Sequence, residues 1–184
     1  MSDRLNHECG LALIRLLKPL EFYQKKYGSV SYGLNKLYLM LEKQHNRGQD
    51  GAGFASVKLN MKPGQRFMHR ERSANQNPIQ EIFKLANENL IKYKKENSKF
   101  KGDIVNLKKN VPHVSELFLG HVRYGTFGQN SKDAVHPFLR QNNWMHRNLI
   151  VAGNFNMTNN NQMFQDLVYL CLLYTSDAAD DRSC

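Results

Sequence analysis

The chain has 184 residues, of which 41% are hydrophobic and 23% are charged, and its formal net charge at pH 7 is +10. This length allows one domain with a buried core, and no apolar run in the sequence is long enough to cross a membrane. Three cysteines with neither metal-ligand spacing nor a disulfide framework favour a reducing compartment, so we expect a cytoplasmic protein without a metal site in this chain.

The positive charge raises the question of a polyanionic partner such as nucleic acid. Much of the excess lies in one lysine-rich segment between residues 84 and 109. Its aromatic residues follow no RNA-binding motif, and the segment is more typical of a solvated insertion. We therefore expect no nucleic-acid partner and no membrane partner.

Hydrophobic periodicity predicts a strand-rich chain with several helices, taken here in chain order. A strand is predicted at residues 11–17, a loop at 18–31, a helix at 32–45, strands at 54–59 and 67–72, and a helix from residue 78 to about 90. A central strand follows at 117–122, then a loop at 135–138, a short buried strand at 149–152 and a helix that begins near residue 161. This order is compatible with several folds and does not by itself specify one.

The two ends of the chain differ in character from the middle. Residues 1–8 contain no apolar stretch, which excludes a secretory signal, and they suit a short leader that is removed. Residues 169–184 do not continue the preceding pattern, and we interpret them as a translated read-through of a sequencing adapter; the alternative is an ordinary acidic tail. One domain would then span residues 9–168.

Four short segments combine glycines with polar residues at strand ends or turns, where the backbone can approach a ligand closely. They are Cys9-Gly10, Arg47-Gly48-Gln49-Asp50-Gly51-Ala52-Gly53, Gly120-His121-Val122-Arg123-Tyr124-Gly125-Thr126 and Gly153-Asn154-Phe155-Asn156-Met157-Thr158-Asn159. Each segment alone is a weak signal. Together, in this order, they predict one site in which the later segments surround Cys9.

Cys9 is the candidate nucleophile. A free thiol has a pKa of about 8.5 and needs a base to remove its proton at neutral pH. If the Glu8–Cys9 bond is cleaved, the new α-amine can be that base, because α-amines have a pKa of about 7.7–8.0. In the uncleaved chain this nitrogen is an amide and cannot act as a base. The alternative is that Cys9 is a small apolar residue opening a strand.

The four segments resemble the class II, or N-terminal nucleophile, glutamine amidotransferases, and most closely the glutaminase half of amidophosphoribosyltransferase. That family typically reads Cys-Gly-Ile, His-Arg-Gly-Gln-Asp-Ala-Ala-Gly, Gly-His-Val-Arg-Tyr-Ser-Thr and His-Asn-Gly-Asn-Leu-Thr-Asn. The resemblance covers roughly residues 9–168. It implies an α+β fold, an αββα sandwich that would be incomplete at its C-terminal end, and a leader of the kind that many of these enzymes remove.

The resemblance also implies a reaction. The Cys9 thiolate would attack the side-chain amide of L-glutamine, ammonia would leave, and water would hydrolyse the thioester to glutamate. In the full-length enzyme the ammonia would react with phosphoribosyl diphosphate to give phosphoribosylamine, the first step of purine synthesis. The Mg²⁺-dependent phosphoribosyltransferase half has no counterpart in these residues, and a homo-oligomer is a further expectation for the full-length enzyme.

Residue roles follow from the same resemblance. Arg123 would bind the α-carboxylate of glutamine through its two-pronged guanidinium, with Gly125 and Thr126 lining the pocket. The side chain of Asn154 and the backbone N–H of Phe155 would donate to the oxyanion. Asn154 also suits a turn, because asparagine tolerates the left-handed conformation.

Other site residues have less defined roles. Arg47 and Asp50 either shape the loop beside the nucleophile or touch substrate, and these two readings are evenly balanced. We expect His121 to be a buried hydrogen-bonding residue behind the site. Gly153 stands where the family has His, and Phe155 stands where it has Gly, so the oxyanion loop departs from the family pattern.

Two alternatives remain open at this point. The chain could be the glutaminase domain of another class II amidotransferase. It could also be a basic nucleic-acid-binding module that uses the lysine-rich segment, but this reading leaves Cys9 and the glycine-flanked segments unexplained.

Overall fold

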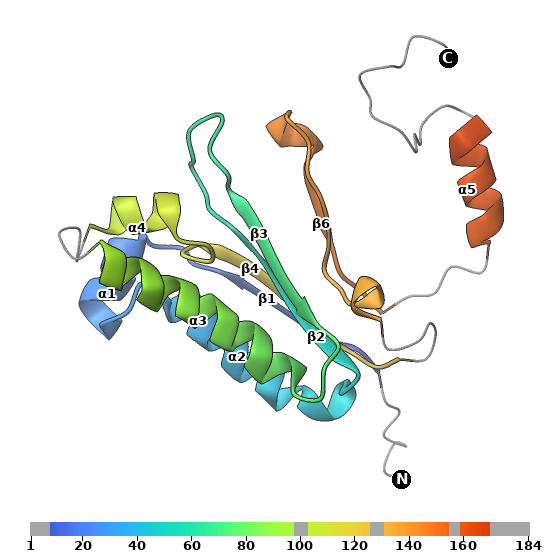
Figure 1. Ribbon diagram of the computed structural model, residues 1–184, viewed down its shortest axis with the longest axis horizontal. Helices are drawn as coiled ribbons and strands as arrows, with labels where there is room; N and C mark the ends of the chain where they lie inside the picture. Colours follow the sequence, from blue (N-terminus) through green and yellow to red (C-terminus); the bar gives the residue numbers. More distant parts are fainter. Residues whose placement is uncertain (1–7, 98–102, 126–130, 155–158, 170–184) are drawn as a thin grey trace. The chain divides into compact units, whose positions relative to one another are not determined.

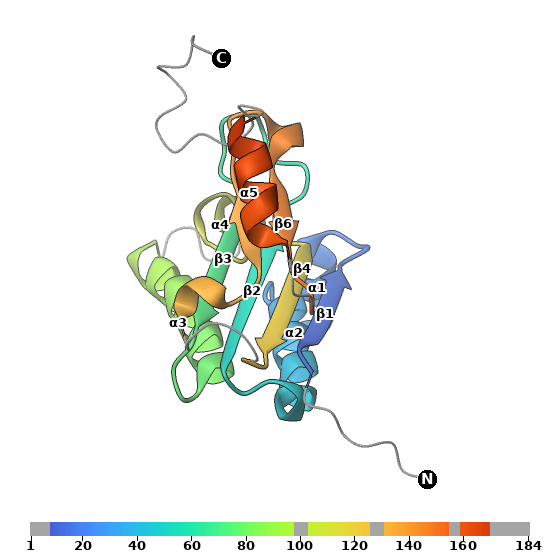
Figure 2. The same ribbon diagram turned by 90° about the vertical axis from the view of Figure 1, so that its right-hand side faces the viewer.

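A four-stranded antiparallel sheet organises the computed structural model, which describes residues 8–97, 103–125, 131–154 and 159–169. The strands are β1 (Gly10–Arg15), β2 (Gly51–Val57), β3 (Met68–Ser73) and β4 (Leu117–Arg123). Their order in the sheet is β1-β4-β2-β3, and Figure 2 shows them side by side. The late strand β4 therefore lies between two early strands.

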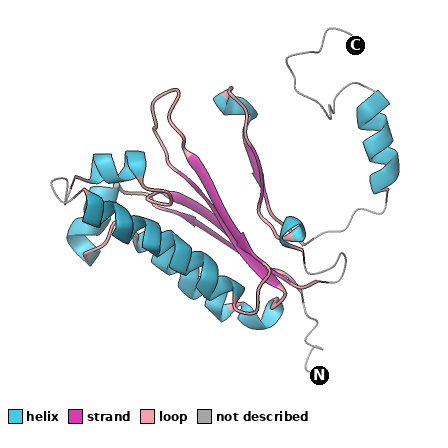
Figure 3. Cartoon of the chain, in the orientation of Figure 1, coloured by secondary structure: helices cyan, strands magenta, loops and turns pink. Residues whose placement is uncertain are grey.

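Helices cover one face of this sheet (Figures 1 and 3). They are α1 (Leu20–Tyr27), α2 (Tyr32–Lys43), α3 (Pro78–Glu96) and α4 (Ile104–Asn110), with α2 and α3 running along the sheet and α1 and α4 near one end. A second sheet consists of two antiparallel strands, β5 (Phe138–Arg140) and β6 (Leu149–Val151). Short 3-10 turns occur at His45–Arg47, Lys132–Ala134 and Met145–Arg147.

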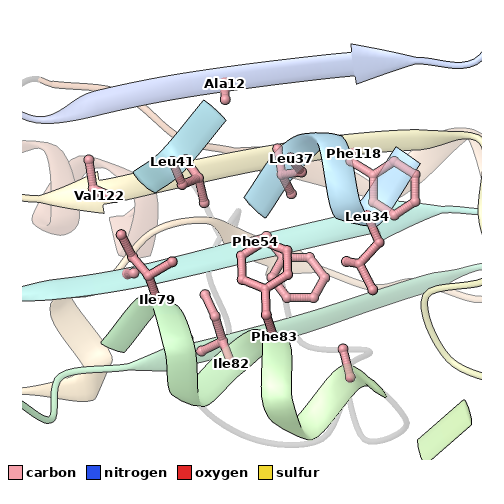
Figure 4. Packing of buried hydrophobic residues seen from close by; sticks show 12 residues of the cluster. Ala12, Leu34, Leu37, Leu41, Phe54, Ile79, Ile82, Phe83, Phe118 and Val122 are labelled. Carbon is pink, nitrogen blue, oxygen red and sulfur yellow. The ribbon is translucent and has the colours of Figure 1, made fainter. Parts of the chain in front are cut away.

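The core lies between the sheet and helices α2 and α3. Alternate strand positions point toward the helices, as the period of two requires, and place Ala12, Phe54, Phe118 and Val122 in one buried cluster. The helices add side chains at helical spacing: Leu34, Leu37, Leu41, Ile79, Ile82 and Phe83 (Figure 4). Gly120 gives α2 room to approach, because a Cβ there would lie 3.0 Å from Leu37 and Leu41. The periodicity that predicted these elements thus also predicts their buried sides.

Three sequence predictions need correction. Residues 18–31 are not a loop throughout, because α1 forms between Pro19 at its start and Gly28, which ends it in the left-handed conformation. The lysine-rich segment is not simply solvated: α4 buries Leu107 in a second cluster with Leu16, Leu20 and Val111. Strand β6 is not fully buried, since Leu149 is 55% exposed and the other two residues of the strand are only partly buried.

The remaining predicted strands and helices are found near their expected positions, except that α3 continues to Glu96 beyond its expected end near residue 90, and β5 was not predicted. The chain divides into two units, Met1–Asn154 and Phe155–Cys184, and the second contains α5 (Asn160–Tyr169), which begins where a helix was predicted. Antiparallel sheets and helices give a mixed α/β architecture, and the complete αββα sandwich stays a prediction. No helix in the described part of the chain has the length and apolar character needed to span a membrane.

Candidate active site around Cys9

Cys9 lies immediately before β1 and against the end of β4. The backbone N–H of Tyr124 donates to its Sγ atom over 3.4 Å, and the carbonyl oxygen of Tyr124 lies 3.9 Å from the same sulfur. The strand register explains this contact, because Gly10 pairs with Val122 and so brings the residue before β1 to the residues after β4. The first and third glycine-flanked segments therefore meet at the candidate nucleophile.

The second segment rests on the same strand end. The backbone N–H of Asp50 donates to the carbonyl oxygen of Arg123 over 3.0 Å, and the Asp50 carboxylate accepts a hydrogen bond from the backbone N–H of Gly125 at 2.7 Å. Gly48 lets the loop pass this closely, because a Cβ there would lie 2.5 Å from the Arg123 carbonyl carbon. These two hydrogen bonds hold Asp50 against the strand end beside Cys9, and the choice between its two predicted roles stays a prediction.

Arg123 points away from the helices, on the opposite face of the sheet from Val122, and is only 5% exposed. A Cβ placed on Gly125 would lie 3.4 Å from Arg123 Nη1 and 3.3 Å from Asp50 Oδ2, so both charged groups flank Gly125. A guanidinium held at a strand end in this way is suited to bind a carboxylate.

Arg47 lies at the surface and contacts Glu8, the residue before Cys9. Its Nη2 atom is 3.3 Å from the carboxylate of Glu8, the residue that would leave if the Glu8–Cys9 bond were cleaved. About half of each side chain is exposed, so this ion pair contributes little to stability and would not oppose removal of residues 1–8. Cleavage would free the Arg47 guanidinium next to the new N-terminus.

His121 is buried, as predicted, but the hydrogen bonds expected of it are not found among the described residues. It is 1% exposed, and neither ring nitrogen meets hydrogen-bond geometry with any residue in the described part of the chain. Burial lowers the pKa of His121 to about 4, and the nearby His136 and Arg123 act in the same direction. At neutral pH His121 is therefore an uncharged, buried ring behind Arg123.

His136 is a site neighbour for which no role followed from the sequence. Its ring centroid lies 4.8 Å from that of His121 and 4.5 Å from that of Phe138. Its Nδ1 atom accepts a hydrogen bond from the backbone N–H of Gly153 at 3.2 Å. This hydrogen bond joins residues that are 17 apart in the sequence, and no local sequence pattern at His136 or Gly153 predicts it.

The fourth segment is described only in part. Asn154 follows Gly153 after β6, is exposed, and makes no hydrogen bond with Cys9 or another residue in the described ranges. Its predicted oxyanion role stays a prediction. Phe155 and Thr126, predicted as a backbone donor and a pocket residue, lie outside the described residues.

Sequence reasoning also missed a chain of polar groups beneath the sheet. Ser56 Oγ lies 2.9 Å from His113 Nδ1, and His113 Nε2 lies 3.3 Å from a Glu71 carboxylate oxygen. These residue types resemble a serine hydrolase triad in kind, but Ser56 has no exposed surface and cannot meet a substrate. We interpret the chain as a structural network in which Ser56 donates to Nδ1 and the Nε2–H group donates to Glu71.

Residues suited to hold a metal do not cluster in the described ranges, where no three His, Cys, Asp or Glu side chains converge. Comparison of the chain with protein-family models, curated proteins and solved structures found no match in any of the three.

Proposed function

We propose that the chain is a class II glutamine amidotransferase domain that hydrolyses L-glutamine to glutamate and ammonia through a Cys9 thioester. The observation that carries this proposal is the convergence of Cys9, the Asp50 carboxylate and the Arg123–Gly125 backbone at one end of the sheet. Three segments separated by tens of residues supply a thiol, a carboxylate and a guanidinium to one place. The sequence resemblance assigns a role to each of them.

The chemistry follows from these groups. Removal of residues 1–8 would convert the Cys9 amide nitrogen into an amine that takes the thiol proton. Arg123, beside Gly125, would pair with the α-carboxylate of glutamine and place the side-chain amide near the sulfur. Asn154 and the Phe155 backbone would stabilise the oxyanion. Arg47, relieved of Glu8, would be a second cation at the mouth of the site.

The proposed context is amidophosphoribosyltransferase, in which the ammonia reacts with phosphoribosyl diphosphate at a separate Mg²⁺-dependent half. The resemblance supports this context through the Gln49-Asp50 pair and the Val122-Arg123-Tyr124 run, which other class II enzymes usually lack. A glutaminase domain of another class II enzyme is the alternative. The DNA that follows the glutaminase region in the natural gene would distinguish them, by encoding a phosphoribosyltransferase, a sugar isomerase or a synthetase.

The test is the intact mass of the expressed protein after treatment with an electrophilic glutamine analogue. We expect loss of residues 1–8 and one adduct on Cys9. The Cys9→Ser variant is the control and should remain unmodified, because the thiolate is absent. Modification of an uncleaved chain at Cys9, or equal modification of Cys9→Ser, would contradict an N-terminal nucleophile.

A further inference from the structure

The rings and backbone around His136 connect β2 with the end of β6. We propose that His136 is a positioning residue, which fixes Gly153 and therefore Asn154 through the Gly153 N–H···Nδ1 hydrogen bond, and which releases them when Nδ1 takes up a proton. The part that concerns turnover rests on the proposed glutaminase function. The hydrogen bond itself does not depend on that function.

Two glycines of β2, Gly51 and Gly53, let the backbone of residues 135–136 pack directly against the sheet. A Cβ on Gly53 would lie 2.2 Å from the His136 carbonyl oxygen, and a Cβ on Gly51 would lie 2.8 Å from a Val135 methyl group. The backbone of residues 135–136 therefore lies directly against the sheet, and a larger residue at Gly53 would displace it. Arg72 adds a second attachment by donating to the Val135 carbonyl oxygen at 3.0 Å.

The His136 ring is held as firmly as its backbone. It contacts the rings of His121 and Phe138, with centroid separations of 4.8 and 4.5 Å, and is itself half-buried. Packing against two rings restricts the freedom of this side chain to turn. Its Nδ1 atom is thus a fixed acceptor, and the Gly153 amide that donates to it takes its position from β2.

The position matters because Asn154 is the next residue in the chain. Asn154 is exposed and makes no hydrogen bond of its own among the described residues. The hydrogen bond from the Gly153 N–H to the His136 side chain therefore holds the backbone next to it. An oxyanion donor is effective only when its geometry is fixed before reaction. His136 would supply that fixation without touching substrate.

This hydrogen bond requires an unprotonated Nδ1. Burial lowers the pKa of His136 below its ordinary 6.5, and the charges of Arg123 and Arg72 act in the same direction. The groups that face the ring are uncharged His121, Arg123 and Arg72, and Asp133 forms a 3.8 Å ion pair with Arg72. The bond is therefore formed at neutral pH and lost only on acidification.

The test observes the Gly153 amide directly. Labelling with 13C-carbonyl alanine and 15N-glycine leaves two Ala-Gly amides, those of Gly53 and Gly153, because the sequence contains only these two pairs. Gly53 lies in the sheet and reports whether each variant is folded. In the wild type we expect the Gly153 amide to exchange slowly at pH 7 and to shift on acidification below pH 6.5.

Two variants separate positioning from packing. His136→Gln keeps an acceptor that does not titrate, so its Gly153 amide should stay protected and lose the acid shift. His136→Leu keeps the bulk without an acceptor, so the amide should exchange rapidly at every pH. An identical acid shift in His136→Gln, or a protected amide in His136→Leu, would overturn the proposal. If His136→Leu does not fold, the comparison of wild type with His136→Gln still decides.

Glutamine turnover gives the second readout. In His136→Leu, kcat should fall by about tenfold to a hundredfold with little change in KM, because misplaced catalytic groups affect the chemical step more than binding. His136→Gln should restore kcat. A rise in KM with unchanged kcat would contradict the positioning role. Absence of glutamine turnover in the processed wild type would reject the proposed function. The pH titration of the Gly153 amide would still test the hydrogen bond to His136.

Discussion

The Asp50 carboxylate lies 2.7 Å from the backbone nitrogen of Gly125, so the loop before β2 is tied to the residues after β4. Asp50→Ala should remove this hydrogen bond and lower the free energy of unfolding by about 1–2 kcal/mol. Asp50→Asn retains an acceptor oxygen and should recover most of that loss. Urea unfolding followed by fluorescence measures the stability of both variants. Equal stability of Asp50→Ala and wild type would contradict a stabilising hydrogen bond between Asp50 and Gly125.

Gly48 passes the end of β4 at a distance that no side chain permits. Gly48→Ala should destabilise the protein by about 1–3 kcal/mol, because the Arg123 backbone cannot move away from the new Cβ without distorting the sheet. Gly125→Ala is the matched control, since its nearest contacts, at 3.3–3.4 Å, are side-chain atoms of Asp50 and Arg123. Thermal unfolding of both variants should rank Gly48→Ala well below Gly125→Ala, and the reverse ranking would contradict this description of the loop.

Two buried histidines predict a specific sensitivity to acid. The pKa of His121 is lowered to about 4 and that of His69 to about 3, both chiefly by burial. Below pH 6.5 these histidines bind protons in the unfolded chain but not in the folded chain. The free energy of unfolding should therefore fall by about 1.4 kcal/mol per pH unit for each histidine.

The contribution of His121 should end near pH 4, whereas that of His69 should continue to about pH 3. Urea unfolding at several pH values measures this slope. His121→Phe should flatten it between pH 6.5 and 4 and should not destabilise the protein at pH 7, because it removes two buried nitrogens without hydrogen-bond partners among the described residues. An unchanged slope in His121→Phe would mean that the ring is charged in the folded state.

Lys58 predicts a rise in stability with pH in the alkaline range. Its side chain is buried, and burial, together with Lys108 and Arg66, lowers its pKa from 10.5 to about 8, while Glu116 opposes this change. Between pH 8 and 10.5 the unfolded chain holds the proton that the folded chain has lost, so stability should rise with pH in this window.

Lys58→Met should remove that rise and stabilise the protein at pH 7 by about 1–3 kcal/mol. Lys62→Met, at an exposed position of the same hairpin, should change stability by less than about 0.5 kcal/mol. Chemical unfolding of the three proteins at pH 7 and pH 10 distinguishes them. A pH-independent difference between Lys58→Met and wild type would contradict the altered protonation.

The meeting of the first three glycine-flanked segments could be predicted from the sequence because these segments lie at strand ends, whereas the roles of their residues stay predictions. The periodicity of Leu34, Leu37 and Leu41 likewise located α2 and its buried side. Helix α1 was missed because Pro19 and Gly28 are loop signals within a segment, yet here they bound a helix. His136 was missed because its role depends on Gly153, on flanking rings and on glycines of β2, which are long-range contacts without a local pattern. Ser56 and His113 were missed for the same reason.

The position of β4 between β1 and β2 has a consequence for biosynthesis. Cys9, the residue before β1, is made more than a hundred residues earlier than its partner Tyr124, and among the described strands β1 pairs only with β4. Until β4 emerges, β1 and the Glu8–Cys9 bond cannot adopt the geometry described above. Any cleavage of the Glu8–Cys9 bond that requires the folded site must therefore occur after translation has passed the end of β4.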